Sequence, residues 1–136
     1  MTNVEVYDLA YRYNCVIDRL SLPESSSVSV NMFGKSFIGL DSGLPDYEEK
    51  EILCHEIGHH AYAGLYTEKT PYETIDRIEH RANKWTYIKL MPIGELREAL
   101  NDPFCRTVPE VADKFGVTED FARDAISYYA ECAGLL

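Results

Sequence analysis

The most constraining feature of this sequence is a pair of histidines, His55 and His59, spaced four positions apart. They lie in a segment, from Asp46 to about Ala63, that predicts a helix capped by Asp46 and ended by Gly64. Residues four apart on a helix lie about 40° apart around its axis, so both imidazoles project from one face. The spacing therefore predicts that the two side chains bind one metal ion.

Glu56 directly follows the first histidine and projects beside the same helix face. Its carboxylate is placed there to take a proton from water, the general-base role in metal-assisted hydrolysis. His60 lies about 140° from His55 around the axis, so it is not expected to join the site. The rest of the helix is apolar on nearly every side, with Ile52, Leu53, Cys54, Ile57, Ala61 and Ala63. Imidazoles in a buried helix need a partner, and nitrogen ligands favour zinc over calcium or magnesium.

A second predicted helix, residues 72–90, offers the third ligand. Its expected inward stripe is Ile75, Ile78, Ala82, Trp85 and Lys89. Glu79 lies at the margin of this stripe, from which a carboxylate reaches a site between the helices. The rivals Asp76 and His80 point about 60° and 100° away from it. Asn83, four residues after Glu79, is expected to hydrogen-bond a metal ligand.

The remaining segments indicate an α+β fold, mainly helical, with a small sheet or hairpin. Further helices are predicted over residues 3–14 (capped by Asn3), 93–101, 108–114 and 119–131, and strands over 28–32 and 36–40. The strand at 28–32 alternates like a half-buried strand. We predict a single domain, 1–136, with a catalytic part (1–91) and a C-terminal helical subdomain (92–136).

Three short stretches give the sequence a family resemblance. His55-Glu56-Ile57-Gly58-His59, then Glu79-His80-Arg81-Ala82-Asn83 and Leu90-Met91-Pro92, resemble the ImmA/IrrE family of metallo-endopeptidases. The resemblance implies a zincin-like fold and a gluzincin-like site, with His55, His59 and Glu79 as zinc ligands and Glu56 as base and acid. It also implies a cytosolic protein substrate, a repressor-type regulator of a phage or mobile element. Arg81 and the Lys84-Trp85-Thr86 run depart from the family pattern, but neither replaces a predicted ligand.

Charge and composition narrow the class of partner. The net charge is -10, from 23 acidic and 13 basic residues, which disfavours a nucleic-acid partner. No apolar run is long enough to span a bilayer, and the N-terminus does not resemble a secretory signal. The four cysteines are scattered, which is typical of free thiols. We therefore expect a cytoplasmic protein without a membrane partner.

Two other functions fit parts of the sequence. Residues 108–122 have the spacing of a helix-turn-helix, with small residues at Ala112 and Gly116. Because the would-be recognition helix carries Glu119, Asp120 and Asp124 against Arg123 alone, we expect it to pack on the catalytic part or to bind a protein. The second alternative is a catalytically silent zinc-binding protein. The donor that stabilises the oxyanion stays open among Tyr62, Tyr66 and Tyr72.

Overall fold

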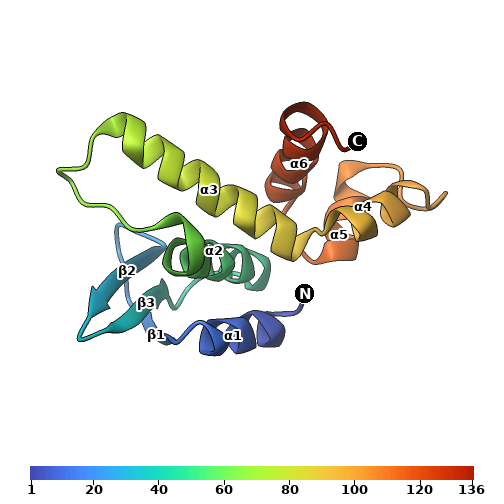
Figure 1. Ribbon diagram of the computed structural model, residues 1–136. Helices are drawn as coiled ribbons and strands as arrows, with labels where there is room; N and C mark the ends of the chain where they lie inside the picture. The colour runs from blue at the N-terminus through green and yellow to red at the C-terminus, as the bar shows by residue number, and fades with distance from the viewer.

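The computed structural model describes residues 1–136 and confirms a mainly helical α+β fold (Figure 1). Its elements are α1 (Asn3–Arg12), β1 (Cys15–Leu20), β2 (Ser27–Met32), β3 (Lys35–Asp41), α2 (Asp46–Gly58), the π-helix η1 (His59–Ala63), α3 (Tyr72–Leu90), α4 (Ile93–Leu100), α5 (Val108–Phe115), α6 (Glu119–Ser127) and the π-helix η2 (Tyr128–Cys132). The sheet lies at one end of an elongated molecule and α4–α6 at the other, with α3 running between them. None of these helices has both the length and the apolar character needed to cross a bilayer.

The sheet has the strand order β1-β3-β2. The predicted hairpin is confirmed, because β2 pairs antiparallel with β3 through a turn in which Phe33 and Gly34 both have positive φ. The strand β1 was missing from the sequence prediction. Asp18 and Arg19 interrupt its apolar pattern, and its only partner, β3, pairs with it in parallel from 21 residues further along the chain (Cys15 with Ser36). A pairing at that distance leaves no local signal.

The burial of β2 is the reverse of what alternation ordinarily predicts. Val28 and Val30 are 44% and 45% exposed, whereas Ser27 and Ser29 are half-buried on the opposite face. The strand alternates as the sequence predicted, but its polar face is the inner one. The serines face inward because their hydroxyl groups donate hydrogen bonds to Glu56 of α2.

Two predicted helix caps were also wrong. Thr2, rather than Asn3, caps α1 in a reciprocal capping box with Glu5, and the Asn3 side chain instead donates to the Asp46 carbonyl. Pro45 occupies the cap position of α2 and makes no side-chain hydrogen bond there. Proline supplies the extended backbone that the helix start needs, so Asp46 lies inside the first turn, where the helix dipole favours its charge.

The close approach of α2 to α3 depends on small residues. A Cβ atom on Gly58 would lie 3.0 Å from the Trp85 ring and 3.5 Å from the Ala82 carbonyl oxygen. The predicted stripe is buried at Ala82 and half-buried at Ile75, Ile78 and Trp85. It missed Thr86 and Leu90, the other two buried residues of α3. Lys89 lies at the edge, with its ammonium group 5.3 Å from the Trp85 ring centroid. The close approach of α2 to α3 brings the two histidines against Glu79.

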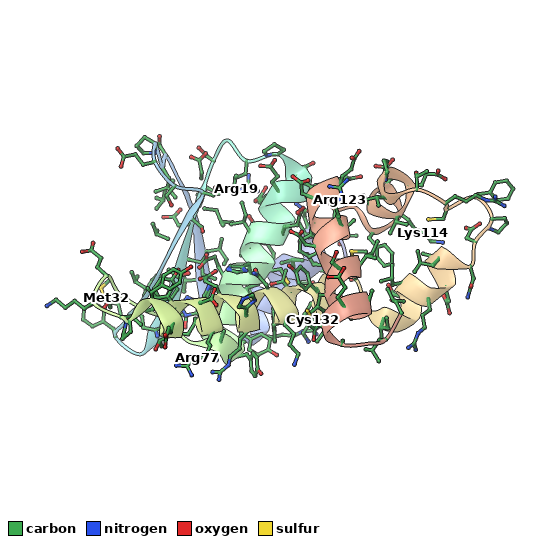
Figure 2. All side chains as sticks on the ribbon, turned by 90° about the horizontal axis from the view of Figure 1, so that it is seen from above. Arg19, Met32, Arg77, Lys114, Arg123 and Cys132 are labelled. Atoms are coloured by element: carbon green, nitrogen blue, oxygen red, sulfur yellow. The ribbon has the colours of Figure 1, made fainter.

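The C-terminal helices pack on α2 and α3. The Glu51 carboxylate on α2 accepts hydrogen bonds from the Thr118 amide and hydroxyl, 3.1 and 2.7 Å away, at the start of α6. The Phe121 ring lies 5.3 Å from the Tyr87 ring of α3. Gly116, at φ +65°, makes the left-handed turn between α5 and α6 that the sequence predicted. Figure 2 shows Cys132 of η2 beside α3, and the cysteines are free thiols, as expected.

Candidate metal centre and active-site cleft

His55 and His59 present their ring nitrogens to one point. The two Nε2 atoms are 3.1 Å apart, and the rings meet edge to face. His55 lies in the last turn of α2 and His59 begins η1, where the backbone widens from α- to π-helix. Such π-helical turns occur frequently at functional sites.

Gly64 fixes the orientation of His59 from both ends. Its amide donates to the His59 carbonyl oxygen, and its own carbonyl oxygen lies 2.8 Å from His59 Nδ1. Gly64 reaches this position with φ +92°, a conformation that glycine adopts without strain. When Nδ1 of the neutral ring donates its proton to this carbonyl oxygen, the lone pair of Nε2 faces His55 and Glu79.

Glu79 completes the group from α3. One carboxylate oxygen lies 3.0 Å from His55 Nε2 and the other 3.0 Å from His59 Nε2. All three donor groups lie within 4.8 Å of one another, and exposure falls from 33% for the Glu79 side chain to 6% for that of His59. A tetrahedral zinc site with bonds of about 2.0–2.1 Å separates its donors by about 3.3 Å. Three donor groups at these separations can share one cation, so the group fits a metal ion.

The rival residues lie elsewhere. Asp76 and His80 form an exposed pair, with 3.6 Å between Asp76 Oδ2 and His80 Nε2, and neither belongs to the group. The His60 ring is half-buried and its two nitrogens have no hydrogen-bond partner. Burial lowers the pKa of His60, which favours a neutral ring. The three-residue group therefore contains none of the three rivals.

Glu56 projects into a cleft beside this group. Its two carboxylate oxygens accept hydrogen bonds from the hydroxyls of Ser27, at 3.0 Å, and Ser29. A pocket of about 310 Å³ runs from His55 and Glu56 toward α6, which contributes Phe121 and Asp124 to its wall. Of the C-terminal helices, α6 thus forms one side of the cleft.

Asn83 also lines this cleft. It lies on α3 one turn after Glu79, and it shares the pocket with His55 and Glu56. No hydrogen bond joins Asn83 to Glu79 or to either histidine, so the predicted support for a metal ligand is not made in this structure. Its amide instead faces space that also continues into a larger groove between α3 and the α6–η2 segment.

The three candidate tyrosines occupy different places. Tyr66 lines a small pocket with Glu56, His59 and Glu79, and its ring centroid is 6.1 Å from that of His59. Burial, followed by the nearby Glu79 carboxylate, raises the pKa of the Tyr66 phenol, so it keeps its proton as a hydrogen-bond donor. Tyr62 lines the groove away from the metal group, and Tyr72 is 80% exposed.

Three residues that build the site were not identified from the sequence. Ser27 and Ser29 contact Glu56 from 29 and 27 residues away, which no local pattern predicts. Gly64 was taken only as a helix stop, and its carbonyl contact with His59 was not expected. The predicted group of His55, His59 and Glu79 is brought together as expected.

One comparison with known proteins bears on this arrangement. The family model Peptidase_M78, described as an IrrE N-terminal-like domain, matches residues 11–127. The match contains every residue of the metal group, the cleft and the β2 strand. No curated protein matches the chain.

Proposed function

This chain belongs to the Peptidase_M78 family of IrrE N-terminal-like domains, and from this premise we propose that it is a zinc-dependent endopeptidase. The observation that carries the proposal is the convergence of His55, His59 and Glu79 on one point, beside a cleft that contains the Glu56 carboxylate. Two imidazoles and one carboxylate are the ligand set of a catalytic zinc site that keeps one position open. Calcium and magnesium prefer oxygen ligands, which supports zinc as the ion.

The chain's own residues supply the proton transfers of hydrolysis. When bound, zinc lowers the pKa of a water molecule and polarises the carbonyl group of the scissile bond. Glu56 accepts the proton of the attacking water and gives it to the leaving amine nitrogen. The Tyr66 phenol donates a hydrogen bond to the carbonyl oxygen as that oxygen gains negative charge. The contact with the Gly64 carbonyl oxygen holds His59 in its orientation toward Glu79 throughout the reaction.

The proposed substrate is a protein partner, a repressor-type regulator of a phage or mobile element. The support is the motif resemblance, together with the cleft between β2, α3 and α6, whose volume of about 310 Å³ is far below that of a folded domain. The acidic face of α6, with Glu119, Asp120 and Asp124, supports a protein partner rather than a nucleic acid.

Replacement of Glu56 by glutamine tests the assigned chemistry. The purified wild type, loaded with zinc, is mixed with a quenched fluorogenic peptide library and with repressor-like proteins encoded beside its gene, with and without a chelator. We expect chelator-sensitive cleavage that falls by roughly 10²- to 10⁴-fold in Glu56→Gln, while zinc content stays at one ion per chain.

Glu48→Gln, an exposed change on the same helix, is the matched control and keeps full activity. Undiminished cleavage by Glu56→Gln contradicts the general-base assignment. Zinc retention in a wild type that cleaves none of these substrates supports the catalytically silent alternative.

A further inference from the structure

The contact between β2 and Glu56 gives both carboxylate oxygens a hydrogen-bond donor. Each oxygen of the carboxylate accepts one hydroxyl hydrogen bond, from Ser27 and from Ser29. The two serines are two positions apart, so they project from the same face of the strand. Glu56 makes no other hydrogen bond and no ion pair, which makes these hydroxyls its only polar partners in the protein.

β2 leaves its apolar side chains partly exposed while its serines make this contact. In a strand with one buried face the apolar residues ordinarily point inward. In β2 the serines point inward, and Val28, Val30 and Met32 are 44–49% exposed. A shift of one residue in register would bury the valines and remove both hydroxyls from Glu56. The observed register therefore favours the serine contacts over hydrophobic burial.

We propose that Ser27 and Ser29 are positioning residues that hold the Glu56 carboxylate in the reactive place within the cleft. This inference rests on the proposed function, because it is the general-base role of Glu56 that makes its position matter. A glutamate side chain has several rotatable bonds, and a freely moving carboxylate spends little time where it can accept the proton. Misplacement of a reacting group by about 1 Å costs as much as 10²-fold in rate.

A purely structural role for the serines predicts a different outcome. If they only attach β2 to α2, their loss lowers thermal stability and reduces the amount of active protein without changing turnover per folded molecule. Ser36 offers a matched control, because it lies in the same sheet and its hydroxyl donates to the Asn31 side chain at 3.2 Å. Ser36→Ala removes a serine hydrogen bond from the same sheet without reaching Glu56.

The experiment compares Ser27→Ala, Ser29→Ala and the double variant with Ser36→Ala. Each is loaded with zinc and assayed on the fluorogenic peptide that the wild type cleaves fastest. We expect kcat to fall roughly threefold to tenfold in each single variant and 10- to 100-fold in the double variant, with KM within about twofold. Threonine at either position keeps a hydroxyl in a strand that accepts β-branched residues. We therefore expect Ser27→Thr and Ser29→Thr to keep most of the wild-type kcat, unlike the alanine variants.

Crystal structures of the wild type and of the double variant give a readout that needs no substrate. We expect one position for the Glu56 carboxylate in the wild type and several in the variant, with zinc stoichiometry unchanged. An unmoved carboxylate in the variant overturns the proposal, as does an equal fall of kcat in Ser36→Ala. A wild type that cleaves nothing refutes the proposed function, while the crystal structures still decide whether the serines position Glu56.

Discussion

Removal of the metal ion should lower the thermal stability of the domain, because the proposed ligands join two helices. His55 and His59 belong to the α2–η1 segment and Glu79 to α3, and these helices otherwise meet through small residues such as Gly58 and Ala82. An ion that binds only the folded state, at a free concentration 100-fold above its Kd, adds about 2.7 kcal/mol to the free energy of unfolding. For a domain of this size, about 3–5 °C of melting temperature corresponds to each kcal/mol. We therefore expect zinc to raise the Tm by about 8–13 °C.

Thermal unfolding followed by circular dichroism measures this shift. The apoprotein is prepared with a chelator and then titrated with zinc, alongside Glu79→Ala and His59→Ala. Each variant keeps only two of the three donors, so the zinc-dependent rise in Tm should largely disappear. His80→Ala is the matched control, since the His80 side chain follows Glu79 directly but is 76% exposed and paired with Asp76.

The result that would refute this reasoning is specific. If zinc leaves the Tm of the wild type unchanged, the three donors do not converge on an ion in solution. If Glu79→Ala responds as strongly as the wild type, the ion is held elsewhere. A loss of the response in His80→Ala would show that the exposed pair takes part in binding.

Tyr66→Phe should lower kcat by roughly 10²- to 10³-fold with little change in KM, because it removes one hydrogen-bond donor to the oxyanion. Tyr72→Phe serves as its exposed control, and equal kinetics in both variants would rule out Tyr66 as that donor. Burial raises the pKa of Glu51 above its ordinary value of 4.5, because the folded state favours the protonated carboxyl group. This group therefore contributes its full stabilisation below pH 4.5 and loses that stabilisation as the pH rises through its folded-state pKa. Urea unfolding at about pH 4 and pH 7 should show the wild type losing stability relative to Glu51→Gln on going to the higher pH; a parallel change in both proteins would contradict this.

Local periodicity was sufficient to predict most of the helices. The segment over residues 72–90 was predicted at its observed bounds, because Pro71 and Pro92 mark its two ends. The four-residue spacing of His55 and His59 placed two ring nitrogens on one helix face without any tertiary information. Even the partner glutamate followed from the margin of an amphipathic stripe, since Glu79 projects where α3 meets α2.

Contacts between distant segments were decided only by the tertiary structure. The parallel pairing of β1 with β3, the inward-facing serines of β2 and the choice of Tyr66 all depend on which segments meet in space. The alternation of β2 defines two faces but does not say which one is buried. The polar face is the inner one here because the Glu56 carboxylate of α2 accepts its hydrogen bonds. The sequence by itself thus determined the helices and the histidine pair, whose causes lie within one or two turns of chain. The surroundings of Glu56 depended on packing between segments nearly 30 residues apart.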